Sequence, residues 1–543
     1  MKRFYKKLMI LSTAALFTTC STEDDLISEW IEVSSIEAPV QGSAGSLDFS
    51  NYVSIGNSLT AGIADGALYT QSQENSYPNL LAAQFAQVDP NVVFNQPDIN
   101  SVNGFNAAFS SVANNVIAGR TELSLSTLVP VPTTGEPIKN FTGDKSALNN
   151  FGVPGLTLAS LDRAGYGTPN VGNVYFERFA ANPSTSSVLG DAIEVDRSFF
   201  SFWLGSNDCL GYALSGGRDM PPLMAYNRMA FGTDLRSALV KLTDGETPGV
   251  VLDIPPIVTL PFFQAVTWDA IELDDATAQR LNTSLEAVNS VIRATQQAGY
   301  TGNTDERLIS YKEGANPILV HDEELDDLGS FFDQLVAAGQ LTAERRASLV
   351  PYEQSRPLVE GELVLLSAAA LLNTEADGDN TVANTPIGIV IPLGFSLTNP
   401  ASSNGDQYFL NIEEQTNIVT ARATYNRVIE ATVKGLNGAD VADIAFVTVQ
   451  PSIVDILGLD VATATRLALP IGSADGIPGI SIEGITLTPD FSPNGIFSTD
   501  GIHPNGRGQG MIANLIIDAI NERWGSSIPT VDVPSLRGTV FRP

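Results

Sequence analysis

Histidine and cysteine are scarce in this 543-residue chain, which contains two of each. So few ligands exclude a zinc module built on Cys and His and a disulfide framework, and they leave few candidates for a general base. Basic residues are also few, because 29 Lys and Arg stand against 61 Asp and Glu and give a net charge of −32. A chain this acidic repels phosphate backbones and anionic membrane surfaces, so we expect no nucleic-acid partner.

Long apolar runs are missing too, and the run near the N-terminus is too short to span a bilayer. Basic residues within positions 2–7 precede an apolar run over residues 8–17, which is typical of a signal peptide. Cys20 follows and opens an acidic stretch, residues 21–25 (STEDD). This pattern resembles a bacterial lipoprotein signal, which implies a signal peptide over residues 1–19, a membrane anchor through lipid on Cys20, and export to the outer membrane with exposure at the cell surface. The alternative is an ordinary secretory signal with an incidental cysteine.

Short apolar runs alternate with helical patterns through the rest of the chain. The runs expected to form strands are residues 48–55, 199–204, 250–257 and 444–449. The segments with helical spacing include residues 76–87, 226–242, 416–433 and 509–524. Buried strands that alternate with helices predict an α/β fold with a parallel sheet covered on both faces. Such sheets bind their ligands at the carboxyl ends of the strands, where the four motifs described next fall.

The first motif, residues 56–62 (GNSLTAG), directly follows the first expected strand. A serine in a strand-to-helix turn, here Ser58, points its hydroxyl into the crevice, and its own N–H can help to bind an oxyanion. The elbow signature G-x-S-x-G is not matched, because Thr60 stands where the second glycine would be, and this counts against an ordinary α/β-hydrolase. By itself, Ser58 also fits the N-cap of a helix.

Three further motifs follow along the chain. Residues 149–157 (NNFGVPGLT) form an irregular loop with an approachable backbone, or simply a tight turn. Residues 204–208 (LGSND) offer the amide of Asn207 to developing negative charge, or form a strand-ending turn. In the fourth motif Asp500 precedes His503 by three residues, so the carboxylate can hold the ring in one tautomer and leave the other nitrogen to act as a base.

Together, the order and contents of the four motifs resemble the SGNH (GDSL-type) hydrolases, a family named for Ser, Gly, Asn and His in these blocks. The resemblance implies that Ser58 is the nucleophile, His503 the general base and Asp500 the acid that orients the histidine. It implies an oxyanion hole made of the Ser58 amide, the Gly155 amide and the Asn207 side chain.

The choice of glycine in the second motif and the residue before Ser58 both bear on this resemblance. The family's second block is typically N-x-x-x-x-G, which selects Gly155 when counted from Asn150 and leaves Gly152 as the alternative. Asn57 stands where the family's other name places Asp, but that position is not among the catalytic four. The segment 56–85 is similar to a subgroup of the family found in lipoproteins.

The resemblance also implies an architecture, a three-layer α/β/α sandwich with a mainly parallel, flavodoxin-like sheet of about five strands. We expect a tether over residues 20–46, a hydrolase core over residues 47–263 and 415–525, and a C-terminal tail over residues 526–543. Residues 264–414 are expected to form a largely helical insertion, either a cap over the substrate or a structural subdomain. Its helices are expected over residues 275–297, 323–338, 341–349 and 361–372.

The expected activity is that of a serine ester hydrolase, an esterase or lipase working through an acyl-enzyme, with no metal and no organic cofactor. Its substrate would be an acyl lipid or an O-acylated glycan. Short-chain or acetyl esters are slightly favoured, because no long exposed apolar stripe is evident in the sequence. The alternatives are a non-catalytic surface lipoprotein that binds glycan or protein through the insertion, and a serine peptidase.

Two remaining residues with reactive side chains receive structural interpretations. His321 precedes an acidic run, so we expect a solvated residue beside an acidic helix start. Cys209 follows the third motif, and we expect a buried, unreactive thiol.

Overall fold

The computed structural model of the protein describes residues 42–111, 116–125, 129–244, 246–374, 386–470 and 478–542. The expected signal peptide, Cys20 and residues 20–41 of the expected tether lie outside these residues. The chain divides into two units, Met1–Ser43 and Ala44–Pro543, and the features below belong to the second.

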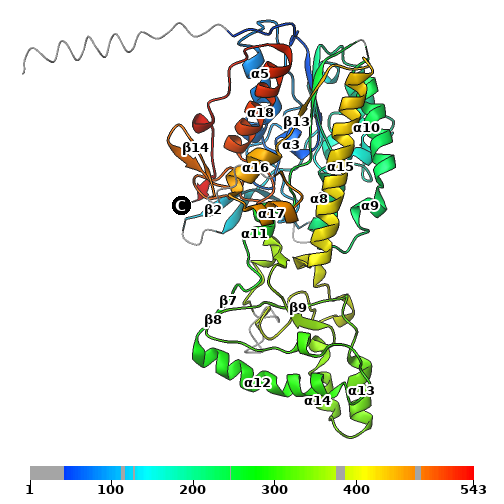
Figure 1. The fold of residues 1–543 in the computed structure, drawn as a ribbon, viewed down its shortest axis with the longest axis vertical. Helices are drawn as coiled ribbons and strands as arrows, with labels where there is room; N and C mark the ends of the chain where they lie inside the picture. The colour runs from blue at the N-terminus through cyan, green and yellow to red at the C-terminus, as the bar shows by residue number, and fades with distance from the viewer. Residues whose placement is uncertain are drawn as a thin grey trace, which may run out of the picture. The chain divides into compact units, whose positions relative to one another are not determined.

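Five strands form the central sheet, in the order β4-β1-β5-β6-β13 (Figure 1). They are β1 (Tyr52–Gly56), β4 (Asn150–Gly152), β5 (Phe199–Trp203), β6 (Gly249–Leu252) and β13 (Ile444–Val447). Every neighbouring pair is parallel. Numbered along the chain, the order is 2-1-3-4-5, that of flavodoxin-like sheets. The expected α/β class and its five-stranded parallel sheet are thus confirmed.

Apolar, β-branched and aromatic residues explain why most of these segments become central strands. All five residues of β1 and of β5 are buried, as expected for strands covered on both faces. Strand β4 is the exception, because its three residues, NFG, carry no such pattern and were expected to lie in a loop. Its position at the edge of the sheet explains why so short a strand suffices.

Helices cover both faces of the sheet and complete three layers (Figure 1). Alternate residues of β1 divide between two apolar clusters, with Val53 in one and Tyr52 in the other. The first cluster includes residues of α10 (Arg228–Leu242) and α15 (Ile412–Gly438). The second includes residues of α5 (Tyr77–Phe85) and α18 (Gly506–Trp524).

The insertion, residues 264–414, packs around an apolar cluster of its own. Its helices are α12 (Asp275–Ala294), α13 (Gly329–Ala337) and α14 (Ala343–Ala347), near three of the expected positions. It also contains the antiparallel pairs β7–β8 (Ile271–Leu273, Gly314–Asn316), β9–β10 (Leu319–His321, Ser355–Pro357) and β11–β12 (Leu363–Val364, Phe409–Leu410).

Two expected boundaries in the insertion change. The prediction of a helix over residues 361–372 was wrong, because β11 lies there and pairs with β12. An apolar run of this length fits a helix or a strand by periodicity alone. Helix α15 begins at Ile412, inside the range given to the insertion, where Asn411 and Glu414 form a capping box.

The segment expected as a C-terminal tail folds back onto the core. Ile528, Val531 and Val533 are buried, and β16 (Phe541–Arg542) pairs with β2 (Ala118–Ser124). The reason lies in α18, where the amide groups of Asn514 and Asn521 each exchange two hydrogen bonds with the backbone of this segment. Among the described residues, no helix has the length and apolar character needed to cross a membrane.

The close contact between β4 and the turn after β1 can be tested at Gly152. A Cβ atom there would lie 2.3 Å from the backbone nitrogen of Ala61. We expect Gly152→Ala to lower the free energy of unfolding by about 1–3 kcal/mol, measured by chemical denaturation. The control is Gly211→Ala in α8 (Asn207–Leu214), where a Cβ meets no atom within 4 Å and the helix gains up to about 1 kcal/mol. Equal stabilities of the two variants would contradict this packing.

Candidate active site

Ser58 is the first residue of the short helix α3 (Ser58–Ala61), immediately after β1. The side chain of Asn57 caps this helix by accepting a hydrogen bond from the Leu59 N–H at 3.0 Å. The capping role considered for Ser58 therefore belongs to Asn57. The Ser58 hydroxyl instead lies 2.9 Å from Nε2 of His503.

His503 and Asp500 complete a hydrogen-bonded chain with Ser58. Nδ1 of His503 lies 2.9 Å from Oδ2 of Asp500. An ionised carboxylate can only accept, so this contact places the ring proton on Nδ1 and leaves the lone pair of Nε2 facing Ser58. The structure thus brings together three residues singled out in the sequence, in the acid–histidine–serine order of a catalytic triad.

The Asp500 carboxylate is ionised because its environment favours the charge. Oδ1 accepts from the N–H groups of Ile502 and His503, both at 2.8 Å, and Oδ2 accepts from the Gly66 N–H at 2.8 Å. Burial alone would raise the pKa of Asp500, but the positive charge that His503 carries when protonated, together with the hydrogen bonds from the His503 ring and from the N–H groups of His503 and Ile502, outweighs it and lowers the pKa to about 2.

Asp65 holds the loop that carries Asp500, and the sequence reasoning missed this residue. Its Oδ1 accepts from the N–H of Thr499 at 3.1 Å and from the hydroxyl of Thr499 at 2.8 Å, and its own N–H donates to the Ser498 hydroxyl at 2.9 Å. Tyr69 donates to the other carboxylate oxygen at 2.8 Å. Asp65 adopts a left-handed conformation, with φ of 55°, and burial raises the pKa of its carboxyl. The Asp65–Gly66 dipeptide could have drawn attention to this residue in the sequence, because Asp-Gly is typical of a turn.

Two of the three expected oxyanion-hole residues, Gly155 and Asn207, lie just after β4 and β5, and the third is Ser58 after β1. Asn207 begins α8 and donates one of its two amide hydrogens to the Leu156 carbonyl at 3.0 Å. The Gly152 N–H is occupied, since it donates to Oδ1 of Asn150 at 2.9 Å. Among the described residues the Gly155 N–H has no acceptor, and Gly155 is exposed with φ of 79°. Of the two glycines, Gly155 is therefore the one that can donate to a ligand.

Polar side chains tie the first three motifs to one another. Asn57 donates to the Ser206 hydroxyl at 2.7 Å, and Asn150 donates to the Thr60 carbonyl at 3.1 Å. Asp208 accepts from the Leu158 N–H at 2.9 Å. Burial raises the pKa of Asp208 to about 6 in spite of this bond. The sequence suggested only local bonds for Asp208, yet its carboxylate binds the backbone of Leu158, 50 residues away and directly after the second motif.

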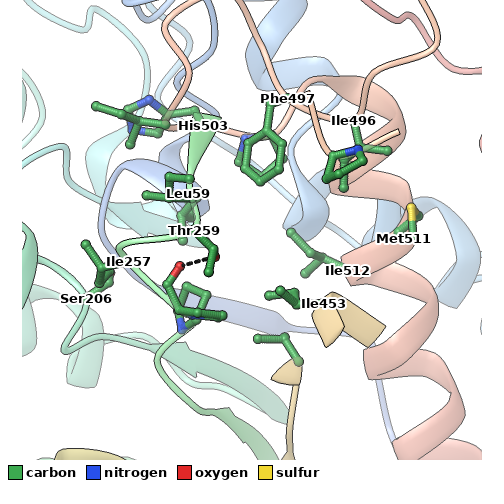
Figure 2. A pocket seen from close by; sticks show the side chains of 18 of the residues that line it. Leu59, Ser206, Ile257, Thr259, Ile453, Ile496, Phe497, His503, Met511 and Ile512 are labelled. Carbon is green, nitrogen blue, oxygen red and sulfur yellow. Dashed lines mark hydrogen bonds between the residues drawn. The ribbon is translucent and has the colours of Figure 1, made fainter. Parts of the chain in front are cut away.

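A pocket lies at the candidate active site and encloses about 990 Å³ when the open solvent at its mouth is included. Ser58, Asn207 and His503 all line it, and most of the remaining lining is apolar (Figure 2). No described residue of the insertion, residues 264–414, lines this pocket.

The other two reactive side chains lie elsewhere. The expectation that His321 is solvated was wrong: it ends β9, is 7% exposed, and its ring packs edge-on against Phe395. Pairing with β10 draws it inward, which the acidic residues after it did not reveal. Cys209 is a free, buried cysteine, and burial raises the pKa of its thiol. Within the described residues, no group of three or more His, Cys, Asp and Glu side chains could hold a metal ion.

In comparison with known proteins, the chain matches no family model, no curated protein and no solved structure.

The low pKa of Asp500 makes stability depend on pH. Its carboxyl titrates at 3.8 ordinarily and at about 2 in the fold, so its stabilising contribution is present above the unfolded value and is lost as the pH falls through the folded one. We expect the difference in free energy of unfolding between wild type and Asp500→Asn to shrink by about 1 kcal/mol between about pH 6 and about pH 3. Unfolding curves recorded across this range check it, and a difference that stays constant or grows would contradict it.

Proposed function

We propose that the protein is a serine ester hydrolase that works by acyl transfer. One observation carries the proposal: the hydrogen-bonded chain from Asp500 through His503 to Ser58, with both contacts at 2.9 Å. A weak hydroxyl nucleophile needs an adjacent base, and the base needs a group that orients it. The absence of the elbow signature G-x-S-x-G does not weaken the proposal, because the triad is defined by geometry rather than by sequence position.

In the first half of the reaction, Oγ of Ser58 attacks the carbonyl carbon of the ester and its proton passes to Nε2 of His503. The carbonyl oxygen becomes an oxyanion. His503 then gives the proton to the alcohol oxygen as the carbon–oxygen bond breaks, and an acyl-enzyme remains on Ser58. Water, deprotonated by His503, attacks this ester in the second half, and the proton returns to Ser58 as the acid leaves.

Three donors are proposed to hold the oxyanion. The Ser58 N–H is at the start of α3, where a helical N–H has no acceptor within its own helix. Gly155 supplies a second N–H and the free amide hydrogen of Asn207 a third. Such donors stabilise charge that develops only as the carbonyl is attacked, so they lower the barrier rather than tighten substrate binding.

The proposal includes a location and a substrate class. Residues 1–19 and Cys20 support export and a lipid anchor in the outer membrane, on the sequence pattern alone. An ester of an acyl lipid or of an O-acylated glycan is the proposed substrate. The alternative, a surface protein that only binds glycan or protein through residues 264–414, gives no reason for the aligned contacts of Asp500, His503 and Ser58.

Removal of the nucleophile is the direct test. We expect Ser58→Ala to lower kcat/KM for p-nitrophenyl acetate by at least about 10³-fold, because the triad acts as a unit. Ser402→Ala, which alters an exposed serine in the insertion, is the matched control and should keep wild-type activity. Undiminished turnover by Ser58→Ala would overturn the assignment of the nucleophile.

Asn207 offers a second test, which separates binding from chemistry. We expect Asn207→Ala to lower kcat by about 10²–10³-fold with little change in KM, because the amide is proposed to act on the oxyanion. Steady-state kinetics on the same ester measure both constants. A raised KM with unchanged kcat would assign Asn207 to ground-state binding instead.

A further inference from the structure

The pocket at Ser58 is lined almost entirely by apolar side chains, although the protein is strongly acidic. The chain contains 61 Asp and Glu residues, yet no described Asp, Glu, Lys or Arg lines this pocket. Figure 2 shows the apolar side chains converging on a central space, with His503 at one side and Met511 at the other.

The pocket runs along helix α18. Gly508, Met511, Ile512 and Leu515 line it, and their spacing places them on one face of the helix. The helix begins three residues after His503, so this face leads away from the proposed catalytic residues. At 1.5 Å per residue, the lining from position 508 to position 515 spans about 10 Å.

Helix α16 (Gln450–Leu457) also lines the pocket. It contributes Ile453, Ile456 and Leu457 to the same pocket. Ile453, Met511, Ile512 and Leu515 are only half-buried, in contrast to core residues such as Ile516 at 0% exposure. Part of their apolar surface is therefore left for a ligand to cover.

An apolar slot of this kind suits the acyl part of an ester and not a sugar. The hydroxyl groups of a glycan would lose their hydrogen bonds to water there and gain few partners, because besides Ser58, Asn207 and His503 the described lining offers the polar side chains of Ser206, Thr259 and Ser452 alone. Each methylene of an acyl chain, by contrast, gains about 0.8 kcal/mol on burial, which is about fourfold in affinity.

We propose that this pocket binds the acyl chain, and that the substrates are esters of medium-chain fatty acids. The inference rests on the proposed function, since it names the substrate class of the same site. An extended chain advances about 1.2 Å per bond, so a span of about 10 Å holds roughly eight bonds. The preference thus shifts from the acetyl esters favoured by the sequence to acyl groups of about eight to ten carbons.

The experiment compares p-nitrophenyl acetate, butyrate, octanoate and laurate as substrates of three proteins. They are the wild type, Ile512→Trp, which fills the slot between α16 and α18, and Glu522→Trp, a control on an exposed position of α18. We expect wild-type kcat/KM to rise at least about tenfold from acetate to octanoate. Ile512→Trp should lower the octanoate-to-acetate ratio of kcat/KM by at least this factor, while Glu522→Trp should behave as wild type.

The outcomes separate the two proposals. Acetate as the best wild-type substrate, or an octanoate preference that survives in Ile512→Trp, overturns the acyl pocket and leaves the hydrolase standing. No turnover of any ester by the wild type overturns the proposed function itself.

Two further measurements keep the test decisive. If Ile512→Trp loses acetate turnover as well, Ile453→Trp fills the slot from α16 instead. A selective loss of octanoate turnover supports the pocket, and unchanged octanoate turnover overturns it. Faster hydrolysis of octyl acetate than of ethyl octanoate would place the alcohol, not the acyl chain, in the slot and overturn the assignment.

Discussion

A single hydrogen bond, between Ser58 and His503, joins positions 445 residues apart, and the arrangement of the candidate active site depends on it. The two residues meet because Ser58 follows β1 at the carboxyl edge of the sheet, while His503 lies in the loop before α18 at the same edge. Neither segment holds this geometry alone. The carboxylate of Asp500 fixes the imidazole, the Gly66 N–H reaches Asp500 from the segment after α3, and Asp65 holds the residues that precede Asp500.

Buried carboxylates organise the edge of the sheet in two different ways. Asp500 is kept ionised by His503 and by backbone donors, as the proposed role of stabilising an imidazolium would require. Asp65 and Asp253 have pKa values raised by burial, and each holds neighbouring backbone in place by hydrogen bonds. Asp253, just beyond β6, accepts from the Thr448 hydroxyl at 2.7 Å and the Val449 N–H at 3.0 Å, and so fixes the turn from β13 into α16. The polar site and the wall of the apolar pocket thus depend on the same sheet edge.

The sequence predicts those elements whose formation depends on residues close to one another along the chain. The apolar runs that become β1, β5, β6 and β13 are readable because burial on both faces leaves a continuous signature. Strand β4 is not, since NFG is placed by its pairing with β1. Ser58, Asn207, Asp500 and His503 could be singled out from their motifs, but the pocket could not. Its walls come from α16, α18 and the segment after β6, and only the folded chain brings them together. His321 shows the opposite error, because the charge of its neighbours concealed its burial.

The proposed function depends on the activation of Ser58 as a nucleophile by His503. Covalent labelling with a fluorophosphonate, followed by mass spectrometry of the intact protein and of its peptides, tests this most directly. We expect one phosphonyl group per chain, located on Ser58, with labelling slowed at least about 10³-fold in His503→Ala. A label on another residue, or equal labelling rates with and without His503, would contradict it.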